Sequence, residues 1–261
     1  MADADLEIIC AQHREFPLHR SPTVVNIQCG RALTGLDLGL PADDSGANIS
    51  ALNPHFSELT AVYWYLENRT PARNIGICHY RRFFDPFALP LKRGDRWPIE
   101  RNRSVEVTLA VAEFTRAPQT SRASGPLLSA ALRTRPLILP RPMSLGVSIE
   151  EQFVVNHGGR GWALMLDVLH ESGEHQAAAV FSSTYLFAWN MLIARRALFL
   201  DYAHWLFPIL LEVHRRMDYD GLDAYQQRLP GFLAERLLTY YVVTRGLIPR
   251  ARQMRIAQFL G

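Results

Sequence analysis

Four consecutive side chains suited to phosphate binding, His79, Tyr80, Arg81 and Arg82, follow a short apolar run that is typical of a buried strand. Guanidinium groups hold phosphate oxygens through paired hydrogen bonds, and ligands of open α/β sheets bind outside the carboxyl ends of the strands. The pattern therefore predicts a clamp for a pyrophosphate. A purely structural interpretation stays open, because arginines at a strand end also pair with nearby carboxylates such as Asp85.

The number of arginines that face this cleft depends on the path of the backbone. Side chains of an extended strand alternate between its two faces, so a straight strand would send only one of Arg81 and Arg82 into the cleft. Both would enter it if the chain turns at this point.

A second group of polar residues lies in the segment 43–60, a turn-rich loop followed by a helix that an asparagine and a proline would start. Asp44, Asn48, Asn53 and Glu58 could bind the hydroxyl groups of a sugar or a ribose. Short carboxylates and amides also form Asx turns and helix caps, so the structural interpretation has equal physical support.

Further candidates come from the ends of other elements. His13 follows the first predicted strand, Asn190 lies in a buried segment, and Arg228, Glu235 and Arg236 flank the start of the last predicted helix. A carboxylate or a bound anion at a helix start interacts favourably with the helix dipole, and most glutamates at that position do nothing more.

Apolar periodicity predicts an α/β domain with a mostly parallel central sheet flanked by helices, because a helix, a short turn and a buried strand over residues 53–79 make half of a βαβ unit. Strands are predicted at 6–10, 24–29, the start of the run 74–85, 105–111, 136–140 and 187–193. Helices are predicted at 53–68, 148–157, 162–169, 199–216 and 232–243. Residues 86–135, rich in proline and arginine, predict an irregular insertion.

The composition predicts a single domain over residues 1–261, kept in the cytoplasm. The chain has 48% hydrophobic residues, an acidic start, and no apolar run long enough to span a membrane. Its three cysteines lie in apolar runs without Cys-x-x-Cys spacing, which predicts neither disulfides nor a zinc site. The net charge of +3 is balanced and the aromatic residues fall at core spacing, so no nucleic-acid partner is predicted.

The C-terminal segment 245–255 carries four arginines among apolar residues. A solvated terminal helix is the usual meaning of such a pattern, and a peripheral contact with the anionic cytoplasmic face of the inner membrane is the alternative. Abundant arginine is itself no functional signal. Only Lys92 among the 28 basic residues is a lysine, which a GC-rich genome would explain.

Several enzyme classes lack their signatures here. No Gly-x-Gly-x-x-Gly, Walker A, Gly-x-Ser-x-Gly or His-Glu-x-x-His pattern occurs, which weighs against dinucleotide oxidoreductases, P-loop enzymes, α/β hydrolases and zinc proteases. The chain instead resembles the DUF4422 family, glycosyltransferase-like proteins of bacterial capsule, exopolysaccharide and O-antigen gene clusters. The resemblance covers nearly the whole chain except residues 86–135. The matching sequence motifs are Asn48-Ile-Ser-x-x-Asn53-Pro-x-x-x-Glu58-Leu-Thr-x-x-Tyr63-Trp64, Ile75-Gly-x-Cys78-His79-Tyr80-Arg81-Arg82-x-Phe84, Ser148-Ile-Glu-Glu-Gln-Phe, Trp189-Asn190-Met191, Tyr202-x-x-Trp205-Leu-Phe-Pro-Ile-Leu and Arg228-x-x-Gly231-Phe-Leu-Ala-Glu235-Arg236-Leu.

The resemblance implies a GT-A-like (Rossmann-like) domain that transfers a hexose, galactofuranose or another, from a UDP-linked or similar nucleotide sugar to a growing glycan or lipid-linked glycan. In ordinary GT-A enzymes an Asp-x-Asp after the comparable strand holds a divalent metal on the diphosphate. This chain has His79 to Arg82 at that place. Metal-independent transfer without a cofactor is therefore expected, because guanidinium groups could neutralise the leaving diphosphate.

The resemblance and the residue chemistry together define the expected site. An inverting transfer needs a carboxylate that deprotonates the acceptor hydroxyl, for which Glu235 is favoured over Asp44 and Glu58. The alternative function is a catalytically inactive glycan-binding or assembly module that has kept the fold. The residues expected to bind the donor are His13, Asn48, Asn53, Glu58, His79, Tyr80, Arg81, Arg82, Asn190, Arg228 and Arg236.

Overall fold

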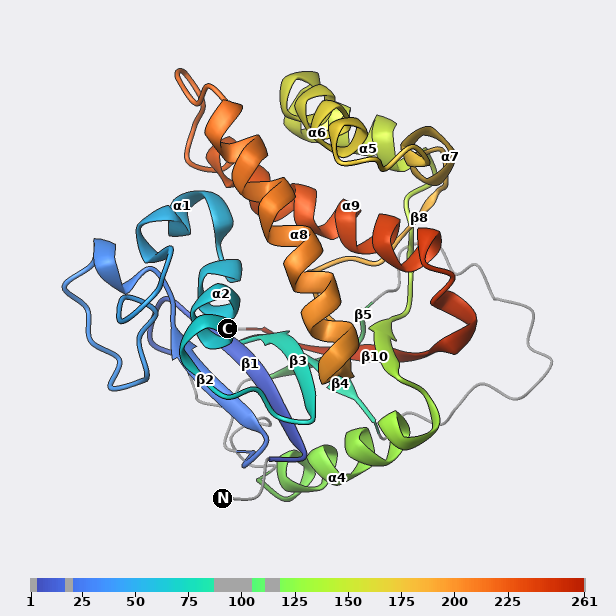
Figure 1. Cartoon of the computed structure of the whole chain (residues 1–261). Coiled ribbons are helices and arrows are strands. Elements are labelled where there is room, and N and C mark those ends of the chain that lie inside the picture. Colours follow the sequence, from blue (N-terminus) through green and yellow to red (C-terminus); the bar gives the residue numbers. More distant parts are fainter. Residues whose placement is uncertain (1–3, 17–20, 87–104, 111–117, 261) are drawn as a thin grey trace.

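The computed structural model describes residues 4–16, 21–86, 105–110 and 118–260, in which helices pack around a mixed sheet (Figure 1). The strands of the main sheet are β1 (Leu6–Gln12), β2 (Val24–Gln28), β3 (Asn74–His79), β4 (Arg82–Asp85), β5 (Val105–Ala110), β6 (Leu137–Pro140), β9 (Ile193–Arg195) and β10 (Ala251–Leu260). A separate short pair consists of β7 (Met143–Ser144) and β8 (Tyr185–Leu186). The α-helices are α1 (Asn53–Phe56), α2 (Leu59–Asn68), α4 (Pro118–Thr134), α5 (Ile149–His157), α6 (Gly159–Glu171), α7 (Ala177–Phe181), α8 (Arg196–Arg216) and α9 (Leu229–Thr244).

The main sheet has the strand order β2-β1-β3-β4-β10-β6-β9, and β5 pairs with β10. Because β9 also pairs with β3, the strands β3, β4, β10, β6 and β9 close into a ring of pairings. The pairs of β1 with β2 and β3, and of β10 with β5 and β6, are parallel, whereas β3–β4, β4–β10, β3–β9 and β6–β9 are antiparallel. The α/β class is confirmed. The prediction of a mostly parallel sheet is wrong, because β3 turns directly back into β4 and the C-terminal strand enters between β4 and β6.

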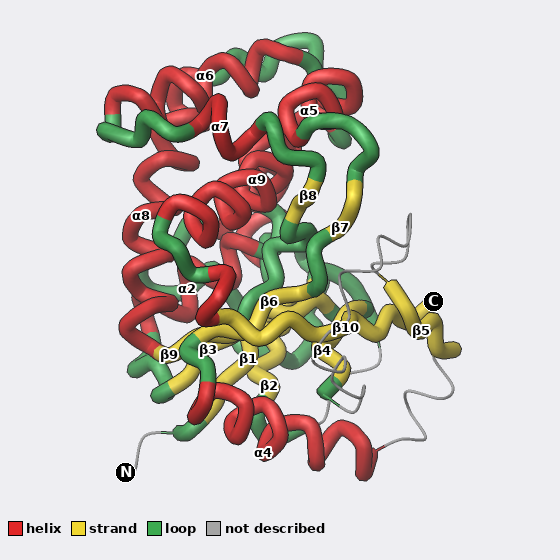
Figure 2. Tube along the Cα trace, turned by 90° about the vertical axis from the view of Figure 1, so that its right-hand side faces the viewer, coloured by secondary structure: helices red, strands yellow, loops and turns green. Residues whose placement is uncertain are grey.

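Helices cover both faces of the sheet and form layers (Figure 2). On one face, Leu128 and Leu132 of α4 lie one helical turn apart and join Ile8 of β1 in a buried cluster. On the other face, Ile9 of β1 joins Phe199 of α8 in a larger cluster, to which α2, α5, α6 and α9 also contribute. The alternation of Ile8 and Ile9 between the two clusters follows from the two-residue period of a strand.

The predicted helix over 53–68 is interrupted, and a continuous helix is the wrong prediction. α1 ends at Phe56 and α2 begins at Leu59, because Ser57 between them has a φ of +50°. Asn53 stabilises this break by donating from Nδ2 to the Ser57 carbonyl oxygen at 2.8 Å. The break turns Ser57 and Glu58 toward the sheet end, where they line a pocket.

Three other predictions also require correction. Residues 187–192 form a loop between β8 and β9 rather than a strand, with φ values of +69° at Trp189 and +52° at Asn190. The C-terminal segment is not a solvated helix, because residues 251–260 form β10 inside the sheet. Within the predicted insertion 86–135, α4 and β5 are regular, and residues 87–104 and 111–117 lie outside the described part.

Several local predictions are confirmed. The strands near 6–10, 24–29, 105–111 and 136–140 and the helices near 148–157, 162–169, 199–216 and 232–243 occur with shifted ends. The Ser148 hydroxyl caps α5 by accepting from the Glu151 backbone N–H at 3.0 Å, as its capping pattern predicts. Among the described residues, no helix has the length and apolar character needed to cross a membrane.

Candidate active site

A pocket of about 600 Å³ opens where the carboxyl ends of β1 and β3 meet the α1–α2 break, the loop 187–192 and the start of α9. Elements far apart in the chain therefore supply its walls. It brings together most of the residues predicted to act on a ligand, namely His13, Asn53, Glu58, His79, Tyr80, Arg81, Arg82, Asn190, Arg228 and Glu235.

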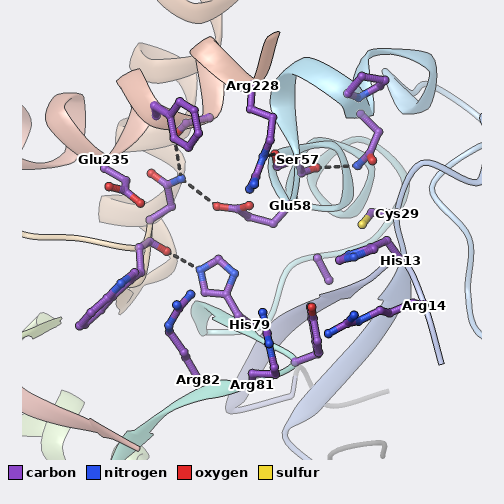
Figure 3. Close-up of a pocket in the computed structure, with 18 of the residues that line it drawn as sticks. His13, Arg14, Cys29, Ser57, Glu58, His79, Arg81, Arg82, Arg228 and Glu235 are labelled. Atoms are coloured by element: carbon purple, nitrogen blue, oxygen red, sulfur yellow. Dashed lines mark hydrogen bonds between the residues drawn. The ribbon is translucent and has the colours of Figure 1, made fainter. Parts of the chain in front are cut away.

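A tight hairpin brings both arginines of the predicted clamp to the pocket. β3 ends at His79 and β4 begins at Arg82, and these two residues pair in antiparallel register. Tyr80 and Arg81 form the turn between them. Because the chain reverses here, Arg81 and Arg82 both line the pocket, instead of pointing to opposite faces of one strand (Figure 3).

Aromatic rings hold the cationic side chains on this wall. The Arg81 and Arg14 guanidinium carbons lie 5.2 Å and 5.4 Å from the centroid of the Tyr80 ring. The Arg82 guanidinium carbon lies 5.5 Å from the Trp189 ring. These distances are within the range of cation–π attraction, so the rings fix the positions of guanidinium groups that would otherwise repel each other.

The concentration of positive charge favours an anionic ligand. Burial lowers the pKa of Arg82, and the neighbouring charge of Arg81 lowers it further. Burial also lowers the pKa of His13, followed by the charges of Arg14, Arg228 and Arg81. A bound polyanion such as a diphosphate would offset both the desolvation and the mutual repulsion.

Two carboxylates, Glu58 and Glu235, lie across the pocket from the hairpin (Figure 3). Burial raises the pKa of Glu235; the charge of Arg236 lowers it, the charge of Glu58 raises it, and His79 lowers it. A carboxylate with a raised pKa is a stronger proton acceptor. Among the described residues, no group of three His, Cys, Asp or Glu side chains is arranged to hold a metal ion.

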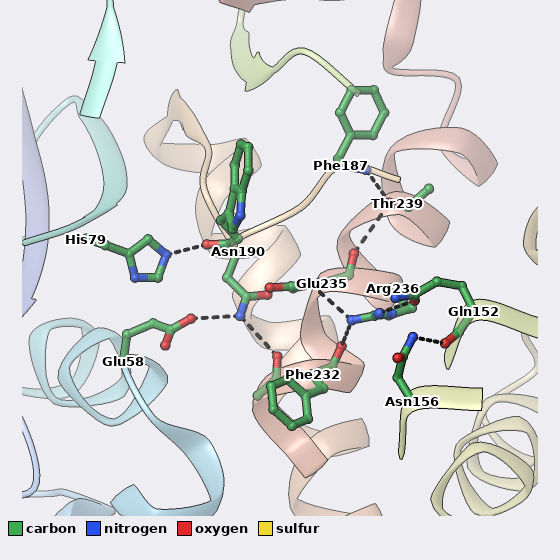
Figure 4. A network of polar contacts seen from close by, with 12 residues as sticks. Glu58, His79, Gln152, Asn156, Phe187, Asn190, Phe232, Glu235, Arg236 and Thr239 are labelled. Carbon is green, nitrogen blue, oxygen red and sulfur yellow. Dashed lines mark hydrogen bonds and ion pairs between the residues drawn. The ribbon is translucent and has the colours of Figure 1, made fainter. Parts of the chain in front are cut away.

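The loop 187–192 braces the pocket through polar contacts (Figure 4). His79 donates from Nε2 to the Trp189 carbonyl oxygen at 2.5 Å, and Asn190 donates from Nδ2 to Glu58 Oε1 at 2.8 Å and to the Gly231 carbonyl oxygen at 3.1 Å. These bonds offset the cost of the two positive φ angles. The Asn190 Oδ1 atom is buried and has no hydrogen-bond partner among the described residues.

Arg236 does not line the pocket, although it was expected to bind the donor. Its side chain is buried between α9 and α5, where it donates to Glu235 Oε2 at 3.1 Å and to Gln152 Oε1 at 2.6 Å. Its guanidinium carbon lies 5.0 Å from the Phe153 ring centroid. Arg236 therefore supports the Glu235 carboxylate from behind.

Asp44 and Asn48 lie on the exposed part of their loop and outside the pocket lining. Asn48 Oδ1 accepts from the Ser50 backbone N–H at 3.1 Å, which is the Asx-turn arrangement that such residues often adopt. The neighbouring Asp43 is fully buried and accepts from the Gly30 backbone N–H at 2.9 Å and from the Ser50 hydroxyl at 2.5 Å. Asp43 thus fixes the turn after β2, beside the pocket.

The pocket residues that were not singled out from the sequence include Arg14, Ser57, Trp189 and Phe232. Arg14 directly follows His13, so the strand-end argument applied to both. Ser57 and Trp189 reach the pocket through positive φ angles that propensities do not predict for a serine or a tryptophan. Phe232 looked like an ordinary core residue of α9.

Comparisons with known proteins give the family and the fold of this chain. A family model described as "Domain of unknown function (DUF4422)" matches residues 7–246. Among solved structures, one titled as the WbbM bifunctional glycosyltransferase in its apo form matches with a TM-score of 0.83 and 22% identity over 98% of this chain. The chain spans 46% of that protein, so the likeness shows a shared fold over about half of WbbM. No curated protein matches this chain. Because the family model covers most of the sequence, the chain belongs to the DUF4422 family.

Proposed function

We propose that this chain is a GT-A-like glycosyltransferase that moves a hexose from a nucleotide-diphosphate sugar, UDP-linked, to a growing cell-surface polysaccharide. The observation that carries the proposal is the arrangement of the pocket. The guanidinium groups of the hairpin lie on one wall and face Glu58 and Glu235 on the other (Figure 3). Glycosyl transfer needs a group that stabilises the leaving diphosphate and a base that activates the acceptor. The fold shared with a protein named as a bifunctional glycosyltransferase supports the same assignment.

Arg81 and Arg82 would stabilise the leaving diphosphate, with His13 and Arg14 beside them. As the bond from the anomeric carbon to the diphosphate oxygen breaks, negative charge builds up on that oxygen. Cations fixed at this position bind the transition state more tightly than the ground state. Because the chain itself supplies the positive charge, we propose that the transfer needs no divalent metal ion.

Glu235 would serve as the general base. In an inverting transfer, its carboxylate takes the proton of the acceptor hydroxyl while the hydroxyl oxygen bonds to the anomeric carbon and the diphosphate leaves from the opposite face. Its burial favours proton uptake, and Arg236 holds it in place.

The direct test is the release of nucleoside diphosphate when the purified chain is incubated with UDP-hexoses and other nucleotide sugars. Donor binding is followed in parallel as a rise in melting temperature. We expect the Arg81→Gln/Arg82→Gln double variant to lose about 100-fold or more in turnover, a typical cost of removing transition-state hydrogen-bond donors. Arg215→Gln is the matched control, because Arg215 is exposed on α8 and pairs there with Glu212.

The outcomes separate the candidate functions. Turnover that depends on the hairpin arginines supports the proposal. A rise in melting temperature with glycans but not with any nucleotide sugar, together with no turnover, would favour the inactive glycan-binding module.

A further inference from the structure

Three aromatic rings stack beside the pocket, on the side of Glu235. His157, at the end of α5, faces Phe232 of α9 with ring centroids 4.2 Å apart and planes 23° apart. Tyr225 packs on Phe232 at 5.0 Å and on His157 at 5.7 Å. Phe232 lines the pocket, and Tyr225 is the outermost ring with 52% of its surface exposed. We call His157, Phe232 and Tyr225 the aromatic strip.

The segment that carries Tyr225 is anchored on both sides. Gln226 donates from Nε2 to the Asn156 carbonyl oxygen of α5 at 3.1 Å, and its backbone N–H donates to Asp223 Oδ1 at 2.8 Å. The His55 ring of α1 bonds through Nδ1 to the Gln227 carbonyl oxygen at 2.9 Å. The exposed ring is therefore held in place before a ligand arrives, which lowers the entropy cost of binding.

The strip is uncharged at neutral pH. Burial lowers the pKa of His157 to about 4, and the charge of Arg236 contributes to the shift, so the imidazole is neutral. Arg236 and Glu235 lie next to the strip as an ion pair. Arg228 is also beside it, with its guanidinium carbon 5.4 Å from the Phe232 ring and its Nε donating to Ser57 Oγ at 3.1 Å. The strip thus differs in chemistry from the cationic hairpin wall, and it suits a neutral ligand with an apolar face.

The strip also lies beside the proposed base. Phe232 and Glu235 are three residues apart on α9, a spacing that places two side chains on the same side of a helix (Figure 4). A molecule with one hydroxyl at Glu235 would therefore continue outward past Phe232 to Tyr225. The hairpin arginines, on the opposite wall, remain available for the diphosphate.

We propose that the aromatic strip is the acceptor subsite, on which a neutral sugar residue of the acceptor glycan stacks through its C–H face while its hydroxyl reaches Glu235. A sugar ring has an apolar face of C–H groups and a rim of hydroxyls, and amphipathic aromatic side chains match that combination. The inference rests on the proposed function, because it assigns the second substrate of the same pocket.

The test compares variants in a transfer assay. Tyr225→Ala should raise the KM for the acceptor about fivefold to tenfold, as expected from the loss of one aromatic stacking contact, with a smaller change in the KM for the donor. Tyr225→Phe keeps the ring and should keep the acceptor KM. Tyr185→Ala is the control, because Tyr185 is also exposed, at 38%, but lies on β8 and not in the aromatic strip. Since Tyr225 is half exposed, its replacement should leave the fold intact, which the melting temperature checks.

A second measurement is independent of turnover. Saturation-transfer NMR with methyl galactoside, methyl glucoside and methyl mannoside reports sugar contact with the protein, and the signal should fall in Tyr225→Ala. A signal that depends on Tyr225 supports the acceptor subsite even if no nucleotide sugar is turned over, so the two proposals can fail separately.

Three results would overturn the inference. The first is an acceptor KM and a sugar NMR signal that both stay unchanged in Tyr225→Ala. The second is weaker UDP binding in that variant with an unchanged acceptor KM, which would assign the strip to the nucleobase. The third is binding to phosphatidylglycerol vesicles that depends on Tyr225 without any sugar signal, which would assign the strip to a membrane surface.

Discussion

Asn190 donates a hydrogen bond of 2.8 Å from its Nδ2 to Glu58 Oε1, which joins residues 132 positions apart in the chain. The same nitrogen donates to the Gly231 carbonyl oxygen at 3.1 Å. One side-chain amide therefore fixes the loop 187–192 against both the α1–α2 break and the start of α9. Asn190 has a φ of +52°, a conformation that asparagine adopts more readily than most residues.

Replacing Asn190 should lower both stability and turnover. Asn190→Ala removes both hydrogen bonds and leaves buried polar partners unsatisfied, so we expect a loss of about 1–3 kcal/mol in the free energy of unfolding by urea. Asn190→Gly removes the same bonds but tolerates the positive φ, so its loss should be smaller by about 1 kcal/mol. Equal stability of the two variants would contradict the idea that the backbone conformation here is strained.

Glu235→Gln should abolish most transfer while leaving donor binding in place. The amide cannot take the proton of the acceptor hydroxyl, so we expect kcat to fall about 10²- to 10⁴-fold. The shift in melting temperature with a nucleotide sugar should persist, which shows that the pocket is intact. Near-normal kcat in this variant would show that Glu235 is not the general base, and Glu58 would then be the next candidate.

The pH profile of the same step gives an independent check on Glu235. A base works in its deprotonated form, and burial raises the pKa of Glu235 above its ordinary value of 4.5, so activity should be lost as pH falls through this higher value. Because the charge of Arg236 lowers that pKa, Arg236→Met should move the acid limb to higher pH. Arg236→Lys keeps a positive charge and should move it less.

Transfer should survive the removal of divalent cations. The proposed leaving-group stabilisation comes from Arg81 and Arg82, so the rate in EDTA should equal the rate in added manganese or magnesium. The measurement is the initial rate of nucleoside diphosphate release after exhaustive chelation. Activity that disappears in EDTA and returns with manganese would contradict metal-independent transfer.

Local sequence patterns predict some elements of this fold and miss others. Ser148 and Glu151 match the capping-box pattern, and the helix begins where that pattern predicts, with the Ser148 hydroxyl accepting from the Glu151 backbone N–H. Such signals depend on neighbours in sequence. The segment 251–260 has no such local signal for its place in the sheet, because β10 is defined by partners in β4, β5 and β6. Its arginines therefore suggested a surface helix.

In the pocket, too, local sequence signals predicted some features, and contacts between distant segments determine the others. The strand-end position of His79 and the adjacent arginines indicated a cationic wall, and the hairpin turn then brought both arginines into it. The sequence predicts a strand at Asn190, because its neighbours in the chain are hydrophobic. The structure has a loop there, which the hydrogen bonds of Asn190 to Glu58 and Gly231 hold in place. Contacts of this kind join distant segments, and single-sequence patterns do not contain them.

Stability should fall in mild acid, with His157 as one cause. The pKa of His157 is lowered from 6.5 to about 4 in the folded protein. Between these values the unfolded chain binds a proton at this residue and the folded chain does not, so the free energy of unfolding decreases as pH falls from 6.5 toward 4. Above that window, His157 is neutral in both states and has no effect on the slope.

The measurement is urea unfolding at several pH values across this window. His157→Asn should flatten part of the slope, because it removes the group that binds protons differently in the two states. His204→Asn is the control, since His204 is exposed on α8. A slope that stays the same in His157→Asn would contradict the assignment.

Gly76 allows the ring of strands to close. Gly76 and Ile193 oppose each other in the β3–β9 pair, and a Cβ atom at Gly76 would lie 2.8 Å from Ile193 Cγ1, well inside van der Waals contact. Gly76→Ala should therefore lower the free energy of unfolding by about 1–3 kcal/mol, the usual cost of overpacking a core. Gly35→Ala is the matched control, because nothing lies within 4 Å of the added Cβ atom there and little change is expected.

A double-mutant cycle identifies the cause of the Gly76→Ala effect. Ile193→Ala removes the clashing Cγ atoms, so adding Gly76→Ala to that background should cost less than it does in the unaltered protein. The measurement is urea unfolding of the four proteins in the cycle. Additive costs would show that contact with Ile193 is not what requires glycine at this position.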